Sequence, residues 1–265
     1  MYILAIETTG PKGSVAVTDE NRNICLRVSS EEMNHLKDLM PMAEDILKEL
    51  SVSKKDLTAV AASVGPGSFT GIRIGVASAR AVAQALHLPA ISVPTLDSFK
   101  TKCRGTSVIV PIFNARRGQV YAGIYDEYGD DILKSGPYML TDCLETLDEW
   151  LSEKQDNLPC GMPETVTVKF YGDGIDAYEK QLRQFAEEIS EKYDVARILF
   201  AEKEERYQTA DMTALRALEK YQAGEVSEAE NLLPDYMRAT EAEQKLADGS
   251  LEKERAAKMA RFMSR

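Results

Sequence analysis

The chain has 265 residues, enough to bury a sizeable core as one large or two small domains. Its formal net charge of −11 argues against solitary binding of nucleic acid, because Lys and Arg side chains neutralise the phosphates in such complexes. No apolar run approaches the roughly 20 residues of a membrane-spanning helix, and no secretion signal opens the chain, so we expect a cytoplasmic protein without membrane contact.

The first part of the chain alternates short strands with two helices. Turn residues and apolar patterns predict strands at Tyr2–Glu7, Gly13–Thr18, Asn23–Val28, Ala59–Val64 and Ala90–Val93. Apolar residues at helical spacing predict one helix from about residue 31 to 50 and a second from Thr70 to Leu86. The predicted order is therefore βββαβαβ.

A glycine-rich turn at Ser63–Gly75 separates the fourth strand from the second helix. Its glycines permit positive φ angles and close approach of other groups, and the helix start offers unpaired N–H groups. The helix itself carries mostly small residues. One interpretation is a tight turn leading into a buried helix. The alternatives are an anion site or a helix that docks a partner.

The second part repeats this order more faintly. Elements are expected as strands at Val108–Ile112, Gln119–Tyr125 and near Ile132, a helix at Asp142–Ser152, a strand at Val166–Tyr171, a helix at Ile175–Lys192, a strand at Arg197–Phe200 and a helix at Asp211–Gln222. A loop insertion is expected at Lys154–Pro163, and the residues after Gly224 form an appendage. The two halves share a topology rather than a sequence.

Tandem units of this kind resemble the actin-like ATPase and sugar-kinase superfamily. Within it, four segments make the chain similar to the TsaB (YeaZ) family, whose members are bacterial partner proteins in threonylcarbamoyl-adenosine synthesis on tRNA. The segments are Ile3–Thr9, Gly65–Gly75, Asn114–Tyr121 and Leu233–Arg238. The Gly-Pro-Gly-Ser-Phe-Thr-Gly-Ile-Arg run is nearly diagnostic, and the others are informative by their order.

The resemblance implies a fold, a domain division and a function. The fold would be α/β, an actin-like ATPase fold of two tandem ribonuclease-H-like subdomains at 1–105 and 106–224, the first with dimerisation helices, and a C-terminal extension at 225–265. The chain would be a non-catalytic subunit that binds and activates catalytic TsaD and supports the ATPase TsaE. It would form a homodimer when alone and meet tRNA only through the complex.

The residues predict neither a metal site nor a catalytic group. Only His35 and His87 occur, and Cys25, Cys103, Cys143 and Cys160 are too scattered for a zinc site or disulfide frame. The resemblance implies that TsaD carries two histidine ligands where this chain has Thr95 and Phe99. No Gly-x-Ser-x-Gly motif or nucleophile–histidine pair is visible. We expect no catalytic residue, no metal and no cofactor.

Two groups of residues remain as candidate sites. By the resemblance, Glu7, Thr8, Thr9 and Lys12 would occupy a vestigial nucleotide-binding turn, and Tyr171–Gly174 offers a second glycine-rich turn; each is also compatible with an ordinary structural turn. The partner interface implied by the resemblance consists of Leu36, Leu39, Met40, Ala43, Leu47, Ile74, Ala77, Ser78 and Ala81.

Three functions are compared. The first is the non-catalytic partner subunit. The second is an ATP-dependent phosphotransferase or ATPase of the same fold, because Glu7, Thr8, Thr9 and both glycine turns are present. The third and most distant is a metalloprotease, for which the sequence offers no ligand set.

Overall fold

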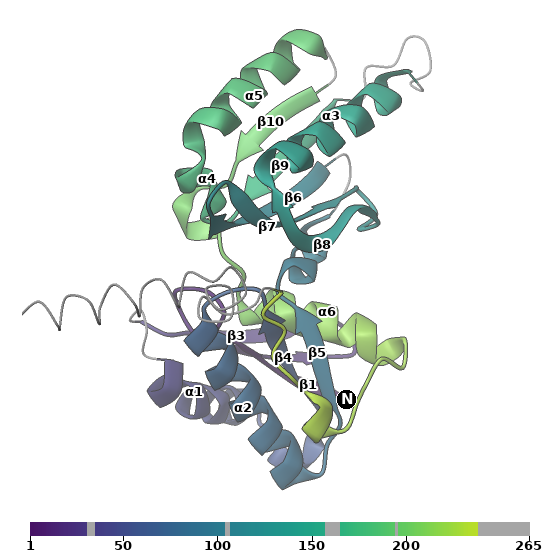
Figure 1. The fold of residues 1–265 in the computed structure, drawn as a ribbon. Coiled ribbons are helices and arrows are strands. Elements are labelled where there is room, and N and C mark those ends of the chain that lie inside the picture. Colours follow the sequence, from purple (N-terminus) through teal and green to yellow (C-terminus); the bar gives the residue numbers. More distant parts are fainter. Residues whose placement is uncertain (31–34, 104–106, 157–164, 194–195, 238–265) are drawn as a thin grey trace, which may run out of the picture. The chain divides into compact units, whose positions relative to one another are not determined.

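Two five-stranded sheets of the same topology carry the fold (Figure 1). The computed structural model describes residues 1–30, 35–103, 107–156, 165–193 and 196–237. The first sheet has the order β3-β2-β1-β4-β5, and the second has the matching order β8-β7-β6-β9-β10. In each sheet the first three strands along the chain are antiparallel and the last two are parallel to the central strand or its neighbour. The predicted duplication of topology is confirmed.

The elements follow the predicted order. The strands are β1 (Tyr2–Glu7), β2 (Ser14–Asp19), β3 (Ile24–Val28), β4 (Leu57–Gly65), β5 (Ala90–Pro94), β6 (Ser107–Arg116), β7 (Gln119–Tyr125), β8 (Asp131–Met139), β9 (Val166–Tyr171) and β10 (Ala196–Phe200). The α-helices are α1 (His35–Glu49), α2 (Phe69–Leu86), α3 (Leu140–Asp156), α4 (Gly174–Ala177), α5 (Glu179–Lys192) and α6 (Ala210–Gln222). Short 3₁₀ turns are η1 (Lys54–Asp56), η2 (Leu96–Lys102), η3 (Lys203–Glu205) and η4 (Ala229–Asn231).

Several expected boundaries differ from the structure. Strands β4 and β6, expected at Ala59–Val64 and Val108–Ile112, are longer, and two helices also differ. The helix predicted at Ile175–Lys192 is divided into α4 and α5, because Tyr178 leaves the helical conformation (φ −126°, ψ 26°) and its hydroxyl donates to the carbonyl of Gln119 at 3.0 Å. Helix α3 continues to Asp156, so the loop predicted from Lys154 starts later. The rest of that predicted loop, 157–163, lies outside the described residues.

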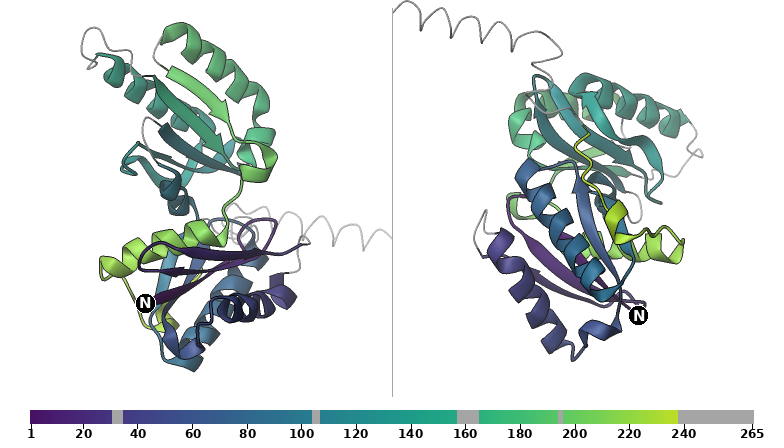
Figure 2. Two further views of the ribbon diagram at one scale, coloured as in Figure 1. Left: turned by 180° about the vertical axis from the view of Figure 1, so that it is seen from behind. Right: turned by 60° about the horizontal axis from the view of Figure 1, so that its bottom comes forward.

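The alternation of side chains along β1 places helices on both faces of the first sheet. Ile3 and Ala5 lie in one core cluster with alanines and Leu218 of α6. Leu4 lies on the opposite face, beside Leu47 of α1. Helix α6 therefore covers one face and α1 and α2 cover the other, although α6 follows the second sheet in sequence (Figure 2).

The second sheet also buries both faces. Its larger cluster joins valines and isoleucines of the sheet to Leu147 of α3 and to Phe185 of α5. On the other face, Phe99 of η2 packs against the rings of Phe113 and Tyr171, with centroid distances of 6.0 and 5.4 Å. The first turn of α6 adds Met212 to this cluster.

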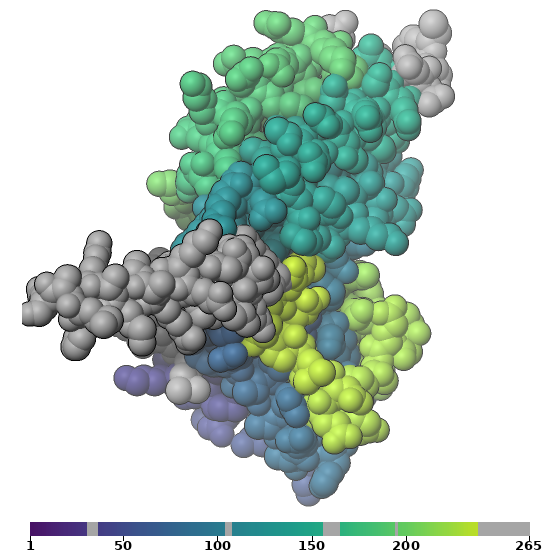
Figure 3. Space-filling view, viewed as in Figure 1, coloured from purple at the N-terminus to yellow at the C-terminus, as the bar shows by residue number. Residues whose placement is uncertain are grey.

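The segment after α6 returns along the first sheet and α2 (Figure 3). Ser227 and Ala90 exchange two backbone hydrogen bonds of 2.8 and 2.9 Å, and the amide of Asp235 donates to the carbonyl of Val64 at 2.7 Å. A side chain at Gly65 would meet the carbonyl oxygen of Asp235 at 2.0 Å, so only glycine permits this contact.

Residues 1–235 form one compact unit by their internal contacts, and 236–265 form a second, of which 236 and 237 are described. The predicted division at 105/106 and 224/225 stays a prediction. Among the described residues, no helix is long and apolar enough to cross a membrane.

Candidate functional site

The turn after β1, where a nucleotide turn was predicted, is built around a buried carboxylate. Glu7 is fully buried at the end of β1. Its Oε1 accepts hydrogen bonds from the backbone N–H and the hydroxyl of Thr9, at 2.5 and 2.6 Å. Its Oε2 accepts from the hydroxyls of Ser63 and Thr213, the latter at 3.4 Å. The predicted residues Glu7 and Thr9 are thus together, but facing the protein interior.

The surroundings of Glu7 favour its neutral form. Burial raises the pKa of this carboxyl above its ordinary value, and hydrogen bonds from Ser63 and Thr9 oppose that shift only in part. Gln208 donates to Thr9 Oγ1 at 2.5 Å, which extends the polar cluster toward the surface. Sequence reasoning missed Ser63, Thr213 and Gln208, since only tertiary packing brings residues so distant along the chain to β1.

The same turn is locked onto the start of α2. The hydroxyl of Thr8 donates to the carbonyl of Gly71 at 2.7 Å, and the amide of Ser68 donates to the carbonyl of Thr9 at 2.9 Å. A Cβ at Gly71 would lie 1.9 Å from the Thr8 carbonyl oxygen, and one at Gly75 would lie 2.3 Å from the Thr8 hydroxyl. The hairpin and the helix are therefore in direct contact where Gly71 and Gly75 meet Thr8.

A pocket of about 290 Å³ lies next to this contact. It is lined by Thr9, Gly10, Pro11, Pro66, Gly67, Ser68, Phe113, Asn114, Tyr121, Asp173, Tyr207 and Gln208. The described lining contains no Lys or Arg; the predicted Lys12 is exposed and is not one of the lining residues. A triphosphate would find helix N–H groups here but no side-chain cation.

The second glycine turn contributes Asp173 to this pocket. Gly172 has φ +94°, and a side chain there would meet the carbonyl oxygen of Ile112 at 2.0 Å. This close packing places Asp173 so that its Oδ1 accepts from the amide of Asn114 at 2.9 Å. Partial burial raises the pKa of the Asp173 carboxyl above its ordinary value. The pocket therefore presents acceptors rather than cations, which disfavours a nucleotide phosphate.

Thr95 and Phe99, the two positions compared with the histidines of TsaD, are packed in the protein interior. Thr95 is fully buried and its hydroxyl donates to the hydroxyl of Thr9 at 3.3 Å. Phe99 is fully buried among aromatic rings.

Among the described residues, no group of three or more His, Cys, Asp or Glu is placed to hold a metal ion. His87 is exposed at the C-terminal cap of α2, and the side chain of His35 lies outside the described part. Cys25, Cys103 and Cys143 are free thiols, while Cys160 falls in an undescribed stretch.

The predicted interface residues divide by exposure. Met40, Ala77 and Ala81 are exposed, and Ile74 and Ser78 are half-buried. Leu39, Ala43 and Leu47 are buried within the chain, and the side chain of Leu36 lies outside the described part.

An apolar groove of about 280 Å³ separates α1 from α2. It is lined by Leu4, Met40, Ala43, Glu44, Leu47, Lys54, Leu57, Val82, Ala85 and Leu86. Ala43 and Leu47 form part of its floor although they are nearly inaccessible. The exposed residues of α2 include the small Ala77, Ala81 and Ala85 as well as the larger Arg73 and Gln84. At the alanines another helix can approach the backbone closely.

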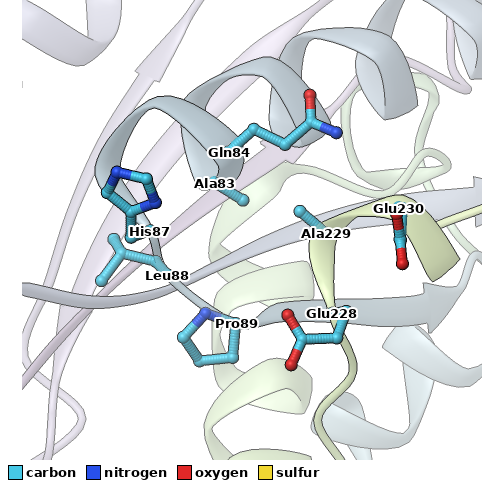
Figure 4. Close-up of a pocket in the computed structure, with 8 residues that line it drawn as sticks. All are labelled: Ala83, Gln84, His87, Leu88, Pro89, Glu228, Ala229 and Glu230. Carbon is cyan, nitrogen blue, oxygen red and sulfur yellow. The ribbon is translucent and has the colours of Figure 1, made fainter.

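A third pocket, of about 430 Å³, opens at the C-terminal end of α2 (Figure 4). Its walls come from the helix end, from Leu88 and Pro89, and from the returning segment with Glu228 and Glu230. His87 and both glutamates are drawn around it in Figure 4. No described group here forms a metal cluster, and the pocket carries no assigned chemistry.

In each sheet three antiparallel strands are followed by two parallel strands that are reached through helices, and this duplicated order defines the class as an actin-like ATPase fold. A family model described as "TsaD: tRNA N6-adenosine threonylcarbamoyltransferase" matches residues 29–246. The tRNA threonylcarbamoyladenosine biosynthesis protein TsaB of Bacillus subtilis is 36% identical over 154 residues, 56% of this chain and 67% of that protein. Its namesake from Escherichia coli is 37% identical over 135 residues, covering 49% and 58%.

This chain belongs to the matched family and, by its similarity to TsaB, to the TsaB/YeaZ family. The solved structure titled "YeaZ from Pseudomonas aeruginosa" has the same fold, with a TM-score of 0.62 at 23% identity over 89% of this chain and 99% of that one. The alignments to the curated relatives span about half of this chain and 58–67% of theirs.

Proposed function

We propose that this chain is a non-catalytic subunit in tRNA threonylcarbamoyladenosine biosynthesis, where it binds and activates a catalytic TsaD subunit and supports TsaE. The names of its relatives support the pathway. The observation that carries the non-catalytic role is the packing of positions 95 and 99. Thr95 and Phe99 are fully buried in hydrogen-bonded and aromatic contacts, so this region serves the core rather than a metal.

The surface formed by α1 and α2 is the proposed site of contact with TsaD. Its central members are Met40, Ala77 and Ala81, which are exposed, together with the half-buried Ile74 and Ser78. Leu36 and the buried Leu39, Ala43 and Leu47 belong to the same proposal, the last two through the groove that they line. Apolar and small side chains on an exposed helix pair permit close helix packing. A second copy of this chain would use the same surface when TsaD is absent, and tRNA would be met through the complex in the cytoplasm.

An Ala77→Glu substitution tests the interface. A buried, unpaired carboxylate at a close helix contact is costly, so we expect loss of assembly with TsaD in sedimentation velocity and loss of threonylcarbamoyl transfer to tRNA. The monomer should unfold at the same denaturant concentration as the wild type, because Ala77 is exposed. Ala177→Glu, at an exposed alanine of α4, is the matched control and should assemble normally. Normal assembly of the Ala77 variant would contradict the proposed surface.

The alternative function, an ATP-dependent phosphotransferase, requires that the chain alone binds ATP, whereas the proposed function does not. Because no Lys or Arg is present in the described lining of the pocket beside Thr9, we expect no calorimetric binding of Mg²⁺-ATP to the chain alone. Micromolar binding accompanied by ATP turnover would favour the alternative.

A further inference from the structure

The turn between β6 and β7 presents two adjacent arginines, Arg116 and Arg117, called here the arginine tip. Both side chains are exposed. They form the single Arg-Arg pair in the sequence. Arg116 pairs with Gln119 across the hairpin, so Arg117 and Gly118 are the two turn residues.

The backbone of the arginine tip is left-handed at three consecutive positions. The φ angles are +63° at Arg116, +56° at Arg117 and +77° at Gly118. Glycine and asparagine adopt this region readily, whereas a long side chain does so at a cost in free energy. A two-residue hairpin turn with positive φ at both positions favours Asn-Gly. Arginine at position 117 is therefore not explained by the turn geometry and points to a use of its side chain.

Hydrogen bonds hold this conformation in place. Asn114 donates its amide to Asp173 at 2.9 Å and accepts from the amide of Arg116 at 2.8 Å through its side chain. The Tyr178 hydroxyl donates to the carbonyl of Gln119 at 3.0 Å. The backbone amide of Leu140 donates to the carbonyl of Gly118 at 3.1 Å. The arginine tip is thus a rigid support, which lowers the entropy lost when its side chains bind.

The two guanidinium groups are not neutralised within the described part of the chain. Arg183, Arg206 and Arg216 are each paired with a carboxylate, whereas no ion pair joins a described carboxylate to Arg116 or Arg117. A guanidinium forms paired hydrogen bonds to phosphate oxygens. On a chain of net charge −11, two adjacent exposed arginines form a local cationic site for phosphate contact.

We propose that Arg116 and Arg117 contact the phosphate backbone of the RNA substrate. The inference rests on the proposed function, which brings the chain to tRNA inside an assembly. The surrounding negative charge makes binding by the isolated chain weak, so the contact operates when other subunits hold the RNA. Backbone contacts of this kind position the RNA and carry no sequence information.

The test measures binding of an unmodified tRNA transcript by the assembled complex, using fluorescence anisotropy over a range of KCl concentrations. The double variant Arg116→Asn with Arg117→Asn removes both cations while retaining a residue that favours positive φ. We expect affinity to fall about tenfold near 0.1 M salt, and the slope of log K against log salt to become shallower by about 1 to 2. The conservative variant Arg116→Lys with Arg117→Lys should keep most of the slope.

The matched control is Arg197→Gln with Lys203→Gln, which removes the same charge from two exposed residues without a described ion pair. It should leave the salt slope unchanged. An unchanged slope in the arginine-tip variant, with a normal assembly, overturns the RNA contact and leaves the proposed function intact. Loss of assembly in that variant also overturns it and indicates an acidic protein partner. Failure of the wild-type chain to assemble with TsaD contradicts the proposed function and this inference together.

Discussion

The turns after the central strands of the two sheets have equivalent places in the topology but opposite environments. In the first sheet, Thr8 and Thr9 are buried and bonded to the start of α2. In the second, Arg116 and Arg117 are exposed. Each turn follows the strand that pairs with both its antiparallel and its parallel neighbour.

The difference follows from where the next glycine turn packs. Gly67 and Gly71 contact Thr9 and Thr8, immediately after the end of β1. In the second half, Gly172 and Gly174 contact Ile112, inside β6, which continues to Arg116. The first hairpin is therefore closed over by a helix, and the second extends past the equivalent helix. A duplicated topology thus leaves the chemistry of corresponding turns free to differ.

The largest expected effect tests the turn after β1, which is closed over by α2. Gly71→Ala places a methyl group 1.9 Å from the backbone oxygen of Thr8, so β1 or α2 must move. We expect a loss of about 3 kcal/mol in the free energy of unfolding, measured by urea denaturation.

The corresponding substitution in the exposed turn between β6 and β7 should cost less folding stability. At Gly118 the nearest atom to an added Cβ is the flexible end of Met139, at 3.2 Å, and the remaining cost is that of φ +77°. Gly118→Ala should therefore destabilise by about 1 kcal/mol. Equal losses for both variants would contradict the contrast between the turns.

The pH dependence of stability tests the buried carboxylate. Because burial raises the pKa of folded Glu7, the folded chain keeps this proton at pH values where the unfolded chain has released it. The stability that comes from Glu7 is present at low pH and is lost as pH rises through the raised pKa. We expect the wild type to lose stability relative to Glu7→Gln as the pH rises, by at most about 1.4 kcal/mol per pH unit. Urea denaturation from pH 4.5 upward measures it, and a constant difference would show that Glu7 ionises normally.

The smallest expected effect has the opposite sign. Replacing Arg116 and Arg117 by Asn relieves the left-handed strain, so the variant should be about 0.5 kcal/mol more stable than the wild type. Thermal and urea unfolding measure this gain. A destabilised variant would indicate that the guanidinium groups contribute to folding, which would remove the reason for assigning them to a ligand.

The sequence by itself determined the order of the elements and the family. Apolar periodicity and turn residues are local signals, and they predicted the strand β1 with its exact ends, the helix α2 and the repeated topology. The glycines at residues 65–75 were expected to permit close approach of another group, and in the structure Gly65, Gly71 and Gly75 each contact another segment of this chain.

Only the tertiary structure decided what the candidate residues do. The polar cluster around Glu7 joins Ser63, Gln208 and Thr213, and α6 returns to the first sheet after the second is complete. Neither is visible in the sequence, because a local pattern does not specify which distant segment will pack against it. The exposure of Arg116 and the burial of Leu39 likewise depend on neighbouring elements rather than on residue type.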